Sequence, residues 1–290
     1  MVGKVKMSVF SVKFQKLWLL ALSFMAFSSY ADKSEQRYVV LAPHIVEMLF
    51  DLGVGQRIVG ATAHSDYPEE AKSIPLVGNY ARLKIENILA YKPDVIFAWH
   101  SGNPSDDLQR LQQLGLNIVY SHTGDLENVA KELIEFGDIV GKPQRAKQIA
   151  DEYLTQLAAL RQKYSAKKPV KVFYELWSRP LTTVANSAWP QHHVTLCGGQ
   201  NVFTGLIGDY PQIGLEQVVA LKPQVIIQPM SDGEPNPDAV NWAQWPKIPA
   251  AKNKLIFEVN SDKLHRMTRR VLGEIDNLCS KIDIARQVYN

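Results

Sequence analysis

The residues of this sequence with the clearest chemical use are aromatic rings in segments predicted to be loops. Their flat apolar faces could stack on a large, flat or partly apolar ligand. For any single ring, packing in the core or at its rim is the simpler explanation, but for the set we favour contact with a ligand. The rings belong to Tyr67, Tyr80, Trp99, Trp177 and Tyr210.

A second candidate is the polar segment 260–266, which follows the last predicted strand and precedes the final predicted helix. Asp262 could simply cap a helix there. The functional interpretation is recognition of amide or phosphate groups by Asp262, His265 and Arg266. Both interpretations stay open at this point.

Seven histidines raise the possibility of a metal receptor. None of them belongs to a closely spaced ligand motif such as HExxH, and cysteine-rich spacing does not occur. The sequence has no GxSxG, Walker or GxGxxG motif and offers no nucleophile with a base. We therefore expect neither an enzyme nor a resident metal or cofactor. An exported enzyme with Asp262 and a histidine as acid and base is the alternative from another functional class.

The elements that must position these residues alternate short β-rich runs with amphipathic helical patterns, which predicts an α/β fold with buried parallel strands. The length of 290 residues suggests about two domains. The clearest helix is predicted at 145–164, where apolar residues recur at three- and four-residue steps, and it would act as a rigid strut. Strands are predicted at 38–41, 57–60, 95–99, 117–120, 170–175, 225–228 and 255–259.

An internal repeat gives the strongest evidence for two related halves. Residues 78–98 and 208–228 match without a gap at an offset of 130, with eight of 21 positions identical. Each copy contains a Gly-Tyr loop, a glutamate in a predicted first helical turn, a Lys-Pro helix end and a buried strand. The glutamates, Glu86 and Glu216, could stabilise their helices through the macrodipole. They could also meet arginines of a two-fold symmetric partner.

The formal charge of +3 comes from the first 31 residues, which hold four lysines and no acid. Beyond them, 28 basic and 29 acidic residues give a net charge of −1, so nucleic acid is not an expected partner. The lysines precede an apolar run at 17–27 and then Ser29-Tyr30-Ala31, a pattern typical of a secretory signal cleaved after Ala31. The run is shorter than the ~20 residues of a membrane span. We expect export to a bacterial periplasm.

The two cysteines, Cys197 and Cys279, both lie in the C-terminal half. An even number of cysteines in an oxidising compartment favours a disulfide, with two buried thiols as the alternative. The bond would staple one half of the chain without linking the two.

These residues resemble the bacterial periplasmic binding proteins for iron-siderophores and cobalamin, and within that family its cobalamin-binding branch. The similarity runs from about residue 37 to residue 281, with both cysteines at the family's disulfide positions. It is carried by SDYP at 65–68, IENILAYKPDVIFAW at 85–99, LCGGQNVF at 196–203, YPQIGLEQV at 210–218 and the segment 260–266.

The resemblance implies a class III architecture, with two Rossmann-like α/β lobes joined by a single long helix and little opening on ligand release. We place the signal at 1–31, the N-terminal lobe at 32–122, the connecting helical segment at 123–168 and the C-terminal lobe at 169–290. Cobalamin would lie in the cleft as a transported ligand, not a cofactor. The protein would be a monomer when free and would dock on the permease dimer of an ABC importer with its ATPase subunits.

By position, the resemblance implies that Glu86 and Glu216 engage arginines of the two permease subunits. The positions that match ligand contacts are His64, Tyr67, Tyr80, Trp99, Trp177, Tyr210, Asp262, Lys263, Leu264, His265 and Arg266.

Several of these positions depart from the family pattern. His64 replaces a tyrosine, Tyr80 and Tyr210 replace tryptophans, Trp177 replaces a phenylalanine, and Lys263-Leu264 replaces an aromatic pair. His64 could approach the cobalt, or it could be packed or face solvent. A siderophore or haem receptor, with ligand carboxylates bound by Arg82, Arg179 and Arg266, and a direct metal-ion receptor remain alternatives.

Overall fold

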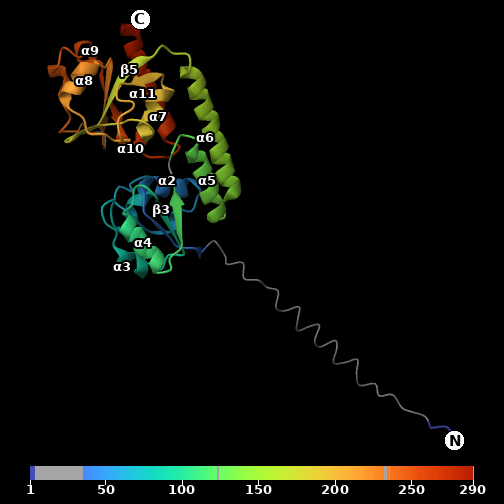
Figure 1. The fold of residues 1–290 in the computed structure, drawn as a ribbon. Coiled ribbons are helices and arrows are strands. Elements are labelled where there is room, and N and C mark those ends of the chain that lie inside the picture. The colour runs from blue at the N-terminus through green and yellow to red at the C-terminus, as the bar shows by residue number, and fades with distance from the viewer. Residues whose placement is uncertain (4–34, 123, 232–233, 235, 290) are drawn as a thin grey trace. The chain divides into compact units, whose positions relative to one another are not determined.

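The computed structural model describes residues 1–3, 35–122, 124–231, 234 and 236–289, and Gln36–Asn290 form one compact unit (Figure 1). The predicted signal at 1–31 falls, except for its first three residues, outside the described part of the chain. In the described part, no helix is both long and apolar enough to cross a membrane. The residue boundaries expected for the lobes and their connection stay a prediction.

The N-terminal lobe contains a parallel sheet with the strand order β2-β1-β3-β4. The strands are short, and β1, β2 and β3 are mostly buried, whereas the edge strand β4 is half-buried over its first three residues. The strands are β1 (Tyr38–Val40), β2 (Ile58–Ala61), β3 (Val95–Trp99) and β4 (Ile118–Ser121). The helices are α2 (Pro43–Asp51), α3 (Ile85–Ala90) and α4 (Ser105–Gln113), with short 3-10 turns η2 (Gly55–Arg57) and η3 (Glu69–Ser73).

The C-terminal lobe contains the second sheet, in which β5, β7, β8 and β9 are parallel and β6 is antiparallel to β5. Its strands are β5 (Val170–Ser178), β6 (Leu181–Thr183), β7 (Gly199–Asn201), β8 (Val225–Met230) and β9 (Ile256–Asn260). Its helices are α7 (Trp189–Leu196), α8 (Leu215–Leu221), α9 (Pro249–Lys252), α10 (Ser261–Leu264) and α11 (Val271–Val288), with the 3-10 turn η4 (Trp242–Gln244).

The two sheets share one topology, which confirms the two related halves expected from the repeat. The parallel order β7-β5-β8-β9 repeats the order β2-β1-β3-β4, with helices in the same places along the chain. Lys92 and Lys222, the equivalent lysines before proline, both have left-handed backbone conformations, with φ values of 46° and 49°. Each marks the end of its helix, because the next residue is a proline that disfavours continued helix.

A single long helix, α6 (Pro143–Tyr164), connects the lobes and packs beside α5 (Asn128–Ile139) (Figure 1). Ile149, Tyr153 and Leu157 on its apolar face are almost fully buried in one core that includes residues of both sheets. Leu154, which the periodicity places on the same face, is instead 39% exposed. The α/β class and the connecting helix are therefore confirmed.

Cys197 and Cys279 form a disulfide, which confirms the predicted bond. Cys197 follows α7 and Cys279 lies in α11, and both are fully buried. The bond holds two helices that pack against the same part of the core.

Candidate functional site

The predicted ligand-binding residues cluster at the carboxyl ends of the two sheets. Tyr67 lies in the loop after β2, Trp99 ends β3, and Trp177 is the penultimate residue of β5. The segment 260–266 begins at the last residue of β9. Loops at these strand ends are where open α/β sheets place ligands.

The two Gly-Tyr loops occupy corresponding places in the lobes. In the N-terminal lobe, the Ala63 N–H donates to the Gly78 carbonyl at 2.9 Å, which holds the Tyr80 loop beside the end of β2. In the C-terminal lobe, the Thr183 N–H donates to the Pro211 carbonyl at 3.1 Å, which holds the Tyr210 loop beside β6. Since β6 pairs with the end of β5, the Tyr210 loop and Trp177 lie on neighbouring segments.

Four of the five predicted rings are exposed to an extent that is unusual for large aromatic side chains. The exposed fractions are 45% for Tyr67, 79% for Tyr80, 65% for Trp177 and 51% for Tyr210. Trp99 is the exception, since it is half-buried and packs edge-on against His44 with ring centroids 5.5 Å apart. Contact of these exposed rings with a ligand stays a prediction.

A cavity of about 400 Å³ opens beside Trp177 in the C-terminal lobe. Pro229 and Ser231 from the end of β8 line it, together with Ser261 and His265 from the segment after β9. The structure therefore brings two of the predicted site residues, Trp177 and His265, to one hollow. Ser261 and Ser231 share a hydrogen bond of 2.9 Å between their hydroxyls, which joins the two strand ends.

Segment 260–266 contains the short helix α10, and its side chains have different structural roles. The Asn260 side chain, not that of Asp262, caps α10 by accepting a hydrogen bond from the Lys263 N–H. Lys263 is exposed, whereas Leu264 is fully buried and its carbonyl accepts a hydrogen bond from the Trp189 indole at 2.9 Å. The Leu264 side chain therefore supports the loop from inside the core.

Arg266 links the two lobes through carboxylates. Its guanidinium contacts Asp66 at 2.6 Å and Glu47 at 3.1 Å in the N-terminal lobe, and Asp262 at 3.6 Å in its own loop. Only 11% of the Arg266 side chain is exposed. Burial alone would raise the pKa of Asp66, but the hydrogen bond and positive charge of Arg266 outweigh it and lower that pKa.

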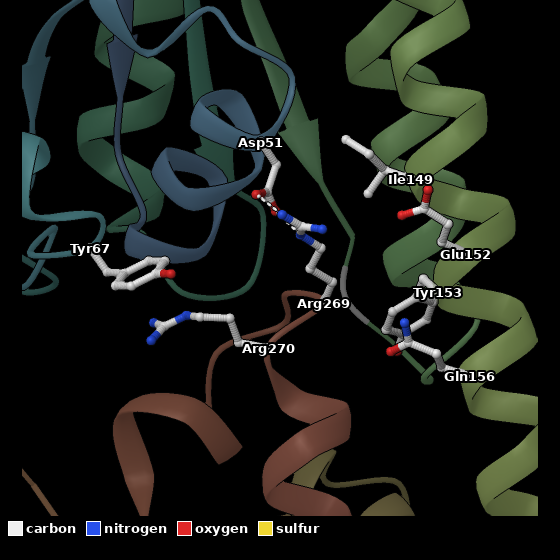
Figure 2. Close-up of a pocket in the computed structure, with 8 residues that line it drawn as sticks. All are labelled: Asp51, Tyr67, Ile149, Glu152, Tyr153, Gln156, Arg269 and Arg270. Carbon is white, nitrogen blue, oxygen red and sulfur yellow. Dashed lines mark hydrogen bonds and ion pairs between the residues drawn. The ribbon is translucent and has the colours of Figure 1, made fainter.

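Two further arginines complete the junction between the lobes. Arg270 binds both carboxylate oxygens of Glu47, and its guanidinium lies 3.6 Å from the centre of the Tyr67 ring. Figure 2 shows this stacked pair next to the bidentate ion pair of Arg269 with Asp51, which has two contacts of 2.8 Å. A cavity of about 230 Å³ separates these side chains from the polar residues of α6. Tyr67 is thus positioned by the opposite lobe through a cation–π contact.

The histidine of the loop is held neutral. Burial lowers the pKa of His265 to about 4, and its Nε2 shares a hydrogen bond of 2.7 Å with the Tyr174 hydroxyl. Asp262 instead faces Arg266. The negative charge of Asp262 acts on His265 in the opposite direction and raises its pKa, but burial outweighs it.

His64, Glu86 and Glu216, the remaining predicted residues described below, are exposed. No group of three or more potential ligand side chains gathers in the part of the chain that the structure describes. His64 is exposed and has a φ of 67°, a left-handed conformation in which histidine is enriched among non-glycine residues. Glu86 and Glu216 are exposed in the first turns of α3 and α8, at equivalent places in the two lobes.

Glu47, Asp66 and Arg270 are site residues that the sequence patterns did not single out. Glu47 carries one detectable signal, because it is a carboxylate within the apolar run HIVEMLF and must find a cation if that run is buried. Asp66 lies inside the SDYP segment but has no feature that predicts its partner. Their partners are about 200 residues away along the chain, beyond the reach of local patterns.

Comparison with known proteins identifies the kind of protein that this arrangement resembles. A model of the periplasmic binding protein family matches residues 39–263. The "Vitamin B12-binding protein" of Vibrio campbellii is 38% identical over 261 residues, which cover 90% of this chain and 94% of the relative. That of Vibrio parahaemolyticus is 34% identical over 276 residues, covering 94% and 98% of the two chains.

Solved structures agree with this result. The crystal structure of the periplasmic vitamin B12 binding protein BtuF of Vibrio cholerae superposes with a TM-score of 0.79 at 33% identity, covering 87% of this chain and 98% of that one. The periplasmic haem-binding protein RhuT from Roseiflexus has a TM-score of 0.77 at 22% identity, covering 87% and 99% of the two chains. At that identity the second match shows the fold alone.

The buried ion pairs of Glu47 predict a large effect on stability. Glu47→Gln leaves Arg266 and Arg270 without their shared carboxylate, so the free energy of unfolding should fall by about 3 kcal/mol or more. The matched change Asp51→Asn breaks a more exposed pair and should cost less than about 1 kcal/mol. Urea unfolding measures both, and equal losses in the two variants would contradict this ranking.

Buried histidines predict a loss of stability in acid. Burial lowers the pKa of His44 to about 3 and of His265 to about 4, and it holds that of His193 well below 6.5. Below about pH 6.5, these three histidines bind more protons in the unfolded chain than in the native protein, so their contribution to the free energy of unfolding decreases as the pH is lowered.

His193 gives the sharpest test of this pH dependence, because both of its ring nitrogens are buried without a hydrogen-bond partner among the described residues. His193→Leu should reduce the slope of unfolding free energy against pH between pH 6 and 5 by up to about 1.4 kcal/mol per pH unit. His192→Gln, at the neighbouring half-buried position, should keep the slope. An unchanged slope in His193→Leu, measured by urea unfolding, would refute the assignment.

Proposed function

Because this chain belongs to the periplasmic binding protein family, we propose that it captures cobalamin in the periplasm and delivers it to an ABC importer. The proteins of this family that it matches are named for binding, and the prediction of a binding protein rather than an enzyme is confirmed by its membership. Cobalamin would then be the transported ligand and not a cofactor.

The observation that carries the proposal is the set of exposed rings at the strand ends of both lobes. Tyr67 and Tyr80 come from one lobe, and Trp177 and Tyr210 from the other. A corrin is a large ring system with extended apolar faces, and aromatic side chains bury such faces at low cost in conformational entropy. The cavity beside Trp177 gives further room for ligand groups, with the Ser231 and Ser261 hydroxyls as polar contacts.

The ion pairs of Arg266 argue against its use as the cation for a ligand rich in carboxylates. A siderophore or haem receptor would need cations for its ligand, but Arg266 is already bound to three carboxylates of the protein. Freeing its guanidinium would leave Glu47 and Asp66 short of a partner, at a cost of several kcal/mol. In the proposed complex, Arg266 therefore keeps Asp66 and the Tyr67 loop in place.

Trp177 should be a main contributor to binding. Its 65% exposure means that a ligand could cover much of the ring, so Trp177→Ala should weaken cyanocobalamin binding at least about tenfold. The control Leu114→Ala removes a half-exposed apolar side chain next to α4, outside the site, and should leave affinity unchanged. Isothermal titration decides the point, and absence of binding by the unaltered protein at micromolar concentrations would overturn the proposed function.

Delivery to an importer would use the two exposed glutamates. Glu86 and Glu216 occupy equivalent places on α3 and α8, so a permease dimer could meet each lobe with the same basic surface. This proposal rests on the internal duplication and on the resemblance of the two segments to docking segments of the family.

Reversing both charges tests this docking role. The double variant Glu86→Lys/Glu216→Lys should bind a reconstituted cobalamin importer at least about tenfold more weakly, while its affinity for cyanocobalamin stays unchanged. Glu135→Lys, a single reversal at an exposed position of α5, is the control. Surface plasmon resonance with the importer in nanodiscs measures association, and equal binding by the double variant and the control would contradict the docking role.

A further inference from the structure

His100 and His122 form an exposed pair of imidazoles at the carboxyl end of the N-terminal sheet. Their ring centroids are 4.8 Å apart and the ring planes are tilted by 36°. Both side chains are exposed, and neither makes a ring-nitrogen hydrogen bond within the described part of the chain. The two imidazoles therefore offer ring nitrogens that could act as ligands of a transition metal.

The backbone fixes this pair in place. His100 directly follows β3 and His122 directly follows β4, and these strands are neighbours with Trp99 opposite Ser121. The His100 N–H donates to the Ser121 carbonyl at 3.1 Å, and the His122 N–H donates to the Glu132 carboxylate. The two α-carbons therefore stay at strand spacing without any contribution from a ligand.

The ring spacing suits a shared ion. Zinc–imidazole bonds of about 2.0–2.1 Å at a tetrahedral angle place two nitrogens on one ion about 3.3 Å apart. Nitrogens at the rims of two rings with centroids 4.8 Å apart can reach that separation through side-chain rotation alone. The Tyr120 ring, 5.6 Å from that of His100 and 6.2 Å from that of His122, limits where the rings can turn.

We propose that His100 and His122 form a two-histidine site for a divalent transition-metal ion, with water completing the coordination. Imidazole ligands favour Cu²⁺, Ni²⁺ and Zn²⁺, whereas Mg²⁺ and Ca²⁺ require oxygen donors. Among these ions Cu²⁺ binds most tightly, following the general order of divalent affinities. Because imidazole must be neutral to bind, protons compete with the metal and acid releases it.

The test is titration of the protein, purified without a polyhistidine tag, with Cu²⁺, Zn²⁺ and Mg²⁺ in turn. We expect one Cu²⁺ bound more tightly than Zn²⁺, and no binding of Mg²⁺ up to about 1 mM. His100→Gln and His122→Gln should each weaken Cu²⁺ binding at least about tenfold. His192→Gln, on α7 in the other lobe, should bind as the unaltered protein does.

Electron paramagnetic resonance of the Cu²⁺ complex gives an independent readout. The spectrum should show two imidazole nitrogens in the unaltered protein and one in either single variant. Both side chains are exposed, so the variants should keep the fold, which circular dichroism checks. Unchanged Cu²⁺ affinity in both variants, or a spectrum without imidazole nitrogens, would overturn the proposal.

Discussion

The structure depends on one apolar core shared by the two lobes through α6. Side chains on one face of each sheet, among them Phe97 in β3 and Tyr174 in β5, belong to the same buried cluster as Ile149 and Leu157 of the helix. Burying each large aliphatic side chain contributes roughly 1.5–3 kcal/mol. Separating the lobes would expose this core, and we therefore propose that the connection acts as a rigid strut and not as a free hinge. On this proposal, the strand ends of both lobes keep a fixed relation to the helix that joins them.

Ion pairs between the lobes add contacts of defined geometry to this apolar core. Glu47 in α2 receives Arg266 and Arg270 from the segment before α11, and Arg270 also lies against the Tyr67 ring. A buried ion pair is stable only in a narrow range of geometries, because its hydrogen bonds must compensate for the hydration that both charged groups lose. The result is that an aromatic residue of one lobe is oriented by a cation of the other. In the proposed function, this pre-orders the ring before ligand arrives, which reduces the entropy cost of binding.

Sequence patterns predicted most of the framework because those features are local. Buried runs such as 95–99, the periodic face of α6 and the 130-residue repeat each express contacts that recur within a few residues or by duplication. The disulfide followed from the number of cysteines and the expected compartment, and the structure contains it. The three-residue strands β6 and β7 were not predicted, because so short a run shows no clear alternation of apolar and polar residues.

The site was harder to predict because tertiary partners determine what each side chain does. The identities of Asp262 and Arg266 do not reveal whether these side chains contact a ligand or each other. Only the fold shows that Arg266 is bound to Asp66 and Glu47. Leu264 likewise belongs to the buried core despite its polar neighbours in the sequence. Trp177 was selected because it follows a predicted strand, where α/β sheets place ligands, and only the structure shows that its side chain is 65% exposed.

The most direct test of the central claim is a crystal structure of the protein grown with cyanocobalamin. The account predicts density for the corrin against the rings of Tyr67 and Trp177, with the Glu47 ion pairs to Arg266 and Arg270 unchanged. Cobalamin bound elsewhere on the surface, or bound between lobes whose Glu47 ion pairs have separated, would contradict it.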